Sequence, residues 1–556
     1  MIAVKNLWQK AWESHDRIKE LLSLMSGRGK GEPPVGERGR MEKVSGKMTG
    51  TYREPSPDGR DFSKKQIVGL ILGPLLFLII FILLPLEGLS TEGRGVLAGT
   101  AWIATWWITE AIPIPVTSLL PIIIFPFAAD IPVGDVTPNY GNDIIFLFLG
   151  GFIIALALER WNLHKRIAIT IIDFIGTSPK RLMLGFMLAT AVLSMWISNT
   201  ATAMMMVPIG TAIIFQLSHL IDESPVENAK EQAERFSKGL MIAIAFAASI
   251  GGLGTIIGTP PNTILAGQLR ELFDIDLSFA GWMLFGVPLS LVLLSIAWFY
   301  LVTFAFPLKL KQIPGGKEVI DGEKRELGRI SNDEKMVLTV FSLTALAWIL
   351  RSFVLQEYVH PNINDAMIAI AGAVVLFMIP SFKYQGVKLM NWDTAKNVPW
   401  GILILFGGGL AIAGGFTETG LDLWIGSQLT VMAGVQFVVI VLAVTTLVIF
   451  LTEITSNTAS ATMLMPIMAS FALAIDVHPF AMMIPAAVAA SCAFMLPVAT
   501  PPNAVVFGSG YLKMGDMVKA GIWMNLISIL IVVTFIMLLL PLVFGIDLQT
   551  FPSQLE

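Results

Sequence analysis

Charged residues and cysteine are both scarce in this sequence. Asp, Glu, Lys and Arg together account for 14% of its 556 residues, while 54% are hydrophobic. Soluble domains carry about 25% charged residues, so a chain of this length with so little charge cannot cover a water-exposed surface. This excludes a soluble enzyme, and the formal net charge of −4 argues against nucleic acid as a partner. The single cysteine, Cys492, excludes an intrachain disulfide.

The sequence also lacks a long apolar run before Ile67, so it shows no signal peptide. From there on, apolar runs of about 16 to 24 residues recur, near the ~20 that a helix needs to cross a bilayer. We predict an all-α polytopic membrane protein with about 11 transmembrane helices. Lys and Arg gather in the N-terminal tail and in loops such as residues 309–335, whereas the segment after Asp547 has neither. Because cytoplasmic loops carry the basic excess, we expect a plasma-membrane protein with a cytoplasmic N-terminus and an extracytoplasmic C-terminus.

Two apolar runs, near 183–215 and 436–475, are about twice too long for one crossing. The first begins and ends beside basic loops, so it must enter and leave on the cytoplasmic face. The second is preceded by a segment without Lys or Arg, so it enters from the opposite face. Non-helical backbone is tolerated at membrane depth only where protein or water surrounds it. We therefore predict two opposed re-entrant hairpins, with tips at Ser198-Asn199-Thr200 and Ser456-Asn457-Thr458.

An internal repeat supports this interpretation. Leu149-Gly150-Gly151 precedes the first tip much as Phe406-Gly407-Gly408 precedes the second. Gly258-Thr259-Pro260-Pro261-Asn262 then follows the first tip as Ala499-Thr500-Pro501-Pro502-Asn503 follows the second. Because the two halves face opposite ways, the sequence predicts an inverted-repeat transporter with its site near the bilayer midplane.

The two Pro-Pro pairs predict helices, over 239–275 and 480–512, that break within the membrane. A broken helix offers carbonyl oxygens to a cation such as sodium, while the N-terminus of its second half attracts an anion. Ser194 precedes Ser198 by four residues and Thr452 precedes Ser456 by four, a spacing that puts the hydroxyls of each pair on one helical face.

We therefore predict two sodium cages made of oxygen atoms. The ligands of the first cage are Ser194, Ser198, Asn199 and the Gly258 carbonyl. Those of the second are Thr452, Asn457 and the carbonyls of Thr455 and Ala499. The alternative is that these hydroxyl and amide groups only satisfy helix ends and close packing. Glu453, beside Thr452, either tunes a cation site, relays protons or pairs with a neighbouring helix.

The paired Ser-Asn-Thr tips, the Thr-Pro-Pro breaks and the segment Trp106–Pro113 resemble the divalent anion/sodium symporter family, which includes sodium-coupled dicarboxylate and citrate carriers. The resemblance covers about residues 69–551. It implies a homodimer in which a mobile transport domain moves against a fixed scaffold, as an elevator. It also implies that substrate carboxylates bind Asn199, Thr200, Asn457 and Thr458, with Thr259 and Thr500 nearby. The predicted substrate site also includes Ser198, Pro260, Ser456 and Pro501.

With this resemblance, we divide the chain into six segments. They are a cytoplasmic tail (1–65), an N-terminal span with scaffold helices (66–130), a first repeat core (131–306), a cytoplasmic loop (307–335), further scaffold helices (336–398) and a second repeat core (399–551).

Three functions of different classes remain open. The first is a sodium-coupled symporter that imports C4 dicarboxylates such as succinate, malate and fumarate. The second is a sodium-independent exchanger of dicarboxylates or tricarboxylates, or a carrier of citrate, sulfate or another divalent oxyanion. The third is a membrane enzyme for lipid-linked substrates, which is disfavoured because the sequence has neither an Asp-Asp pair nor a His-Glu-X-X-His motif. A channel is disfavoured because opposed hairpins suit alternating access.

Neither tip and neither Pro-Pro break contains Lys or Arg. A dianion bound there would have no countercharge from these segments, and burying two carboxylates without one is very costly. Sodium bound beside the substrate would supply that charge, which gives coupling a physical basis.

Overall fold

The computed structural model describes residues 63–222, 229–308, 316–430 and 434–552. Nearly all of the predicted N-terminal tail lies outside these residues, as does part of the predicted cytoplasmic loop. The described residues form helices, apart from one isolated β-bridge between Pro380 and Lys388. The all-α prediction is confirmed for this part of the chain.

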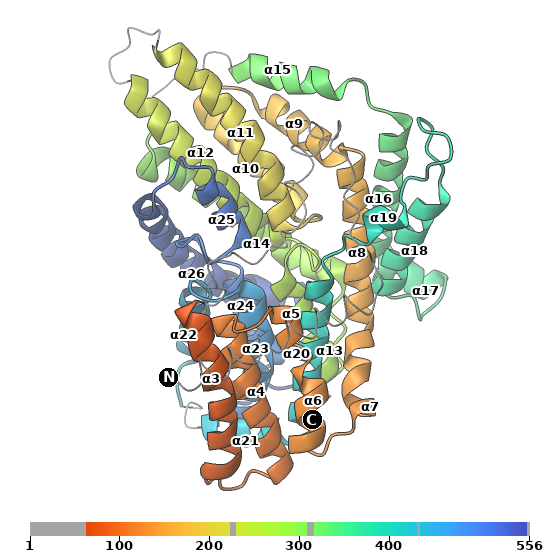
Figure 1. Ribbon diagram of the computed structural model, residues 1–556, viewed down its shortest axis with the longest axis vertical. Coiled ribbons are helices and arrows are strands. Elements are labelled where there is room, and N and C mark those ends of the chain that lie inside the picture. Colours follow the sequence, from red (N-terminus) through yellow and green to blue (C-terminus); the bar gives the residue numbers. More distant parts are fainter. Residues whose placement is uncertain (1–62, 223–228, 309–315, 431–433, 553–556) are drawn as a thin grey trace, which may run out of the picture. The chain divides into compact units, whose positions relative to one another are not determined.

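The helices follow one another in four groups along the chain (Figure 1). The first group is α3 (Lys64–Leu78), η1 (Ile79–Leu83), α4 (Thr91–Thr109), α5 (Ile114–Thr117), α6 (Leu120–Ala128), α7 (Val133–Val136), η2 (Thr137–Gly141) and α8 (Asp143–Arg160). The second is α9 (Leu163–Ile175), α10 (Pro179–Ser194), α11 (Asn199–Asp222), α12 (Ala229–Gly252), α13 (Pro260–Phe273), α14 (Phe279–Tyr300) and η3 (Leu301–Ala305). The third is α15 (Gly316–Leu327), α16 (Asn332–Leu350), η4 (Arg351–Leu355), α17 (Gln356–Tyr358), α18 (Asp365–Met378) and α19 (Trp392–Ala395). The fourth is α20 (Trp400–Thr419), α21 (Leu421–Leu429), α22 (Phe437–Thr452), α23 (Asn457–Ala474), α24 (Pro479–Ala490), α25 (Pro501–Gly508) and α26 (Met514–Phe544).

Seven of the described helices are long and apolar enough to cross a membrane. They are Lys64–Leu83, Val133–Arg160, Asn199–Leu217, Phe279–Ala305, Asn332–Tyr358, Trp400–Thr419 and Met514–Phe544. The shorter apolar helices Ile114–Ala128, Asp365–Met378, Phe437–Thr452 and Pro479–Ala490 add to these. Short apolar helices are the ones expected where the chain turns back or unwinds inside the membrane.

Both long apolar runs are divided by a short non-helical turn. The first run forms α10 and α11 with a break at residues 195–198, and the second forms α22 and α23 with a break at 453–456. The breaks therefore precede the positions expected for the tips by a few residues. Asn199 and Asn457 are the first helical residues of the second arms rather than members of the turns.

The two helices that carry Pro-Pro pairs are also broken. The chain leaves helical geometry at residues 253–259 and 491–500, and each Pro-Pro pair opens the helix that follows. Proline is tolerated there because the first helical N–H groups have no partner in the helix. The first of these helices begins at Ala229 rather than near 239, because the apolar pattern marks only its apolar part and the helix continues through a polar stretch.

The two repeats interlock around these breaks. α25, which follows the second break, packs against α11 and α12, while α13, which follows the first break, packs against α23 and α24 (Figure 1). Each Pro-Pro break therefore lies beside the hairpin of the other repeat. This exchange brings segments more than 200 residues apart into one polar region.

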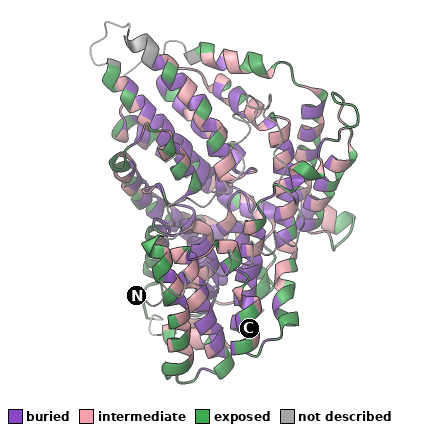
Figure 2. Cartoon of the chain, in the orientation of Figure 1, coloured by how far each residue is buried: buried purple, intermediate pink, exposed green. Residues whose placement is uncertain are grey.

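The helices next to the Pro-Pro breaks and the helices far from them differ in how deeply they are buried. Every residue of α24 is buried, whereas α3 buries only Gly69 and Gly73 (Figure 2). A helix that is apolar throughout and wholly buried belongs to the protein interior, while an apolar helix with an exposed surface faces lipid. The broken helices are therefore the centre of the packing.

Two neighbouring glycines of the repeat motif give a matched test of this packing. A Cβ on Gly150 would lie 2.6 Å from the backbone carbon of Ala369 in α18, whereas a Cβ on Gly151 would lie 3.5 Å from Ile257 Cδ1, an ordinary contact. Gly150→Ala should lower stability by about 1 to 3 kcal/mol. Gly151→Ala should leave it unchanged or raise it slightly, because alanine is the better helix former. Thermal unfolding in detergent measures both, and equal losses would contradict the α8–α18 contact.

Candidate functional site

The first tip is built around the Ser194 hydroxyl, at the last residue of α10. Its Oγ lies 2.5 Å from Asn199 Oδ1 and 2.6 Å from the carbonyl oxygen of Ala248 in α12. Ser198 instead lies in the turn, where its Oγ accepts a hydrogen bond of 3.1 Å from the Ala201 amide. The prediction that Ser194 and Ser198 share one helical face is wrong, because the helix ends at Ser194.

Asn199 packs closely against the break of the same repeat. A Cβ on Gly252 would lie 2.9 Å from Asn199 Oδ1 and 3.0 Å from the Gly258 carbonyl oxygen. Glycine at position 252 therefore lets these two oxygens approach the backbone, next to Ser194. Three of the four groups predicted for the first sodium cage meet here, and Ser198 is engaged elsewhere.

The second tip has threonines in the corresponding region, but their contacts differ from those of the first tip. Thr452 ends α22, and its Oγ1 donates 3.0 Å to the Ile449 carbonyl. Thr455 Oγ1 donates to the Leu451 carbonyl at 2.8 Å and lies 2.6 Å from Ser460 Oγ. Asn457 Oδ1 is buried and has no hydrogen-bond partner among the described residues. A buried amide oxygen without a partner costs about 1 to 3 kcal/mol unless something binds it.

Both tips fit sodium as a bound co-substrate. Hard cations prefer hydroxyl, amide and carbonyl oxygens, and these are the groups present. The feature that points to an ion is the buried Asn457 Oδ1, which has no hydrogen-bond partner among the described residues.

The residues of the second tip line a cavity of about 550 Å³. Its lining includes seven predicted residues: Thr455, Ser456, Asn457, Thr458, Ala499, Thr500 and Pro501. The residues of the first tip are not among those that line it, although Ser198, Asn199 and Thr200 are likewise only partly buried. Each tip is therefore partly accessible.

This cavity also carries charge that the tip sequences do not reveal. Lys65 and Gln66 at the start of α3, with Glu110 at the end of α4, form part of its wall. Gln66 Nε2 donates 3.1 Å to the Glu110 carbonyl, which ties these two helices together. One basic and one acidic residue thus line the same cavity as the tip, which the tip sequences alone do not reveal.

The threonines of the two breaks have different partners. Thr500 Oγ1 accepts a hydrogen bond of 3.2 Å from the Asn503 amide and so caps α25. Thr259 makes no such cap, and its Oγ1 lies 3.3 Å from Ser491 Oγ in the break of the other repeat. This pair is a direct polar contact between the two breaks. Pro260 is partly buried and Pro501 exposed.

Two asparagines that the sequence analysis did not assign stabilise the unwound segments. Asn262 Nδ2 lies within hydrogen-bond distance of the carbonyls of Gly252, Leu253 and Thr255, at 2.8 to 3.4 Å. Asn503 Nδ2 makes the equivalent contacts in the second repeat, with two carbonyls at 3.0 and 3.3 Å. Both residues close the repeated Thr-Pro-Pro-Asn motif, so the sequence did contain this signal.

Glu453 stabilises the second unwound segment by accepting hydrogen bonds from its backbone amides. Its carboxylate, 3% exposed, accepts hydrogen bonds from three consecutive backbone amides, Phe494, Met495 and Leu496, at 2.8 to 3.0 Å. Asn525 Nδ2 in α26 donates a fourth at 2.7 Å. Glu453 therefore has clear partners, and it joins the second tip, the second break and α26.

Comparison with known proteins places these features in a family. The family profile described as "Sodium:sulfate symporter transmembrane region" matches residues 64–546. A protein of Staphylococcus saprophyticus, described as "Sodium-dependent dicarboxylate transporter SdcS", is 50% identical over 492 residues, which are 88% of this chain and 94% of that protein. A Staphylococcus aureus protein with the same description is 50% identical over 501 residues, or 90% and 96% of the two chains.

Two solved structures share the fold at low sequence identity. The Alcanivorax borkumensis YdaH transporter has a TM-score of 0.50 at 15% identity, covering 74% of this chain and 87% of that one. Neisseria gonorrhoeae MtrF, described as illuminating a class of antimetabolite efflux pumps, has a TM-score of 0.51 at 12% identity, covering 88% and 97%. These similarities establish the architecture of an all-helical, multi-span membrane protein.

The Glu453 contacts give a test at this site. In Glu453→Gln the amide NH₂ must face at least one backbone N–H, so at least one contact to residues 494–496 is lost. Ala499, whose carbonyl is a predicted sodium ligand, follows that segment in the sequence, so loss of the contact should displace this ligand. The sodium concentration for half-maximal uptake should rise about tenfold, which corresponds to the loss of one charge-assisted hydrogen bond.

The apparent KM for substrate at saturating sodium should change far less. Glu418→Gln, an exposed acid at the end of α20, is the matched control and should behave as wild type. An equal fall of both affinities, or a fall in folded protein alone, would contradict a role in positioning the cation site.

Proposed function

Because the chain belongs to the sodium:sulfate symporter family, we propose that it imports C4 dicarboxylates such as succinate, malate and fumarate together with sodium. It is a multi-pass membrane transporter and not an enzyme. The proposal is supported by the 50% identity to relatives described as sodium-dependent dicarboxylate transporters. The observation that carries it is the second tip, where Asn457 has a buried Oδ1 without a hydrogen-bond partner among the described residues and lines a cavity together with Ser456, Thr458 and Thr500.

The carboxylates would bind where helices begin. α11 and α23 start at Asn199 and Asn457, and α13 and α25 start directly after Thr259 and Thr500. The N-terminus of a helix presents free N–H groups and a partial positive charge, which favours anions. In our proposal one carboxylate binds each tip, with the Asn and Thr side chains as further donors.

Sodium would supply the charge that these donors lack. At the first tip it would bind Ser194, Asn199 and the Gly258 carbonyl, and at the second Thr452, Asn457 and the carbonyls of Thr455 and Ala499. Each ion would then lie next to the amide side chain that also faces the substrate. By linkage, each ligand raises the affinity of the other by the same factor, so the dianion and the ions cross the membrane together.

The residues that line the cavity at the second tip support a site that is open to the cytoplasm. Its wall includes the start of α3, which follows the basic N-terminal tail and is cytoplasmic in our proposed orientation. The site would therefore be open to the cytoplasm here. Movement of the two repeat cores against the scaffold helices would expose it to the outside, with two copies of the chain joined as a homodimer.

The coupling is tested by uptake of radiolabelled succinate into proteoliposomes. An inward sodium gradient should drive accumulation, and replacing sodium by choline should abolish it. Succinate counterflow that persists in choline would instead identify the sodium-independent exchanger and overturn the proposed coupling.

The site is tested with Asn199→Ala and Asn457→Ala. Each substitution removes one donor or acceptor to a charged ligand, so each should lower uptake by at least about tenfold. Asn397→Ala is the control, because the Asn397 side chain donates to the Asp393 carbonyl in an exposed segment away from the tips. Full activity of either tip variant would show that the tips do not form the site.

A further inference from the structure

A second polar cavity, of about 440 Å³, lies away from the tips, where α8 ends and α9 begins. Arg160, Trp161 and Asn162 form one wall, and the connection from α15 to α16 forms another, with Arg329 and Ser331. Lys383 and Tyr384, from the loop after α18, also line the cavity, as do Lys165, Glu326, Leu327 and Glu334. None of these residues belongs to the proposed transport site.

Two adjacent buried acids hold the walls in place. Asp333 accepts hydrogen bonds from the Phe382 amide at 2.7 Å, the Lys383 amide at 3.2 Å and the Ser381 hydroxyl at 3.1 Å. Both Asp333 and Glu334 are buried in the first turn of α16. Asp333 thus fixes the loop that carries Lys383 and Tyr384.

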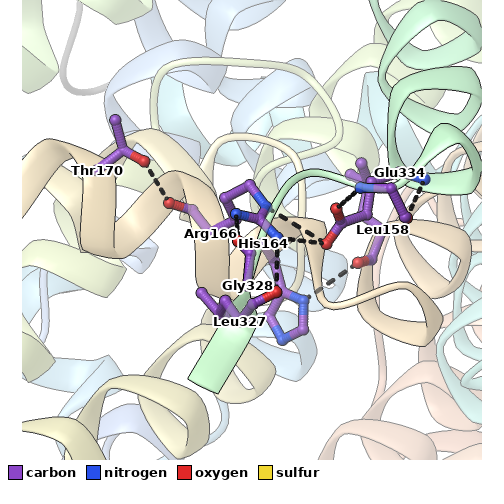
Figure 3. Close-up of polar contacts among 8 residues, drawn as sticks. Leu158, His164, Arg166, Thr170, Leu327, Gly328 and Glu334 are labelled. Atoms are coloured by element: carbon purple, nitrogen blue, oxygen red, sulfur yellow. Dashed lines mark hydrogen bonds and ion pairs between the residues drawn. The ribbon is translucent and has the colours of Figure 1, made fainter. Parts of the chain in front are cut away.

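Glu334 fixes the opposite wall through Arg166 of α9. Its Oε1 accepts hydrogen bonds from Arg166 Nη2 at 3.1 Å and Nε at 3.3 Å. Arg166 also donates to the carbonyls of Leu327 and Gly328, each at 3.0 Å (Figure 3). Arg166 of α9 therefore ties the backbone just before Arg329 to Glu334 of α16. Burial lowers the pKa of nearby His164, so its imidazole is neutral at pH 7 and adds no charge.

The cavity has an excess of positive charge after these contacts are made. Lys165 is paired with Glu323 at 2.7 Å and with Glu326 at 3.7 Å, and Glu334 is paired with Arg166. Arg160, Arg329 and Lys383 form no ion pair among the described residues. Arg160 Nη1 is shielded from solvent and has no hydrogen-bond partner in that part of the chain.

The positive-inside rule explains why basic residues gather at this end of the helices. It does not explain a shielded guanidinium nitrogen without an acceptor, because an unsatisfied charged donor costs more than a neutral one. Arg160 and Lys383 also lie over the rings of Trp161 and Tyr384, at 5.8 and 5.2 Å. Those two rings are 6.3 Å apart, so each cation lies against one of two neighbouring aromatic rings.

We propose that this cavity binds a phosphate-bearing anion, namely the headgroup of an anionic phospholipid. Arginine presents donors in the geometry of phosphate oxygens, and the volume lies within the range of small-ligand sites. A lipid is favoured over a soluble phosphate because exposed aromatic residues flank the cavity. Phe382, beside Lys383, is 63% exposed, and Tyr384, which lines the cavity, is 50% exposed, as expected at a membrane–water interface.

Native mass spectrometry of the full-length, delipidated protein tests this site. Phosphatidylglycerol should bind, while phosphatidylcholine, which has no net charge, should bind at least tenfold more weakly. The double variant Arg329→Gln/Lys383→Gln should weaken phosphatidylglycerol binding by about a hundredfold, from two charge-assisted contacts at about tenfold each. Both residues are exposed, so folding should be preserved.

Lys317→Gln/Lys335→Gln is the charge-matched control. It removes two exposed lysines from α15 and α16 that do not line the cavity, and its lipid affinity should stay within twofold of wild type. Equal affinities of the two double variants would overturn the proposal.

Glycerol 3-phosphate, added as a soluble competitor, distinguishes a site for a phospholipid headgroup from a site for a soluble phosphate compound. Failure to displace phosphatidylglycerol supports the lipid. If glycerol 3-phosphate binds as tightly as the lipid and is lost in the same variant, the phospholipid assignment is wrong.

Discussion

A helix that ends inside the membrane leaves backbone N–H and C=O groups without partners, and this constraint governs the central part of the structure. Within the described residues, the helices are broken at the two tips and at the two Pro-Pro sites. Most of the freed groups are satisfied within the protein, by Asn262 and Asn503 for carbonyls and by Glu453 for amides. The Asn457 side-chain oxygen Oδ1 is also buried at these breaks and has no hydrogen-bond partner among the described residues, and we assign it to sodium.

The two repeats meet this constraint in different ways. In the first, neutral groups hold the break, since Thr255 Oγ1 donates 2.5 Å to the Met195 carbonyl and Trp282 Nε1 donates 3.0 Å to Leu253. In the second, the Glu453 carboxylate does so, one residue from Thr452. In our proposal Thr452 belongs to the second sodium site, and a carboxylate near a site favours a cation there. We therefore expect the second cage to bind sodium more tightly than the first.

Run length and basic loops predicted the two hairpins and the two broken helices, because these features follow from bilayer thickness and charge. The exact turn was misplaced by a few residues, since Ser, Asn and Thr suit both a turn and the start of a helix. The contacts of Glu453 with Asn525, and the position of Lys65 beside Thr458 on one cavity, could not be predicted. They join parts of the chain far apart in sequence, and no local pattern encodes which helices become neighbours.

The central claim is that sodium is the countercharge of the bound dicarboxylate, and reciprocal binding tests it most directly. Succinate affinity of the purified protein would be measured by calorimetry across sodium concentrations, and sodium affinity across succinate concentrations. The account predicts that each ligand tightens the other by the same factor, at least about tenfold. A succinate affinity that is independent of sodium would contradict it.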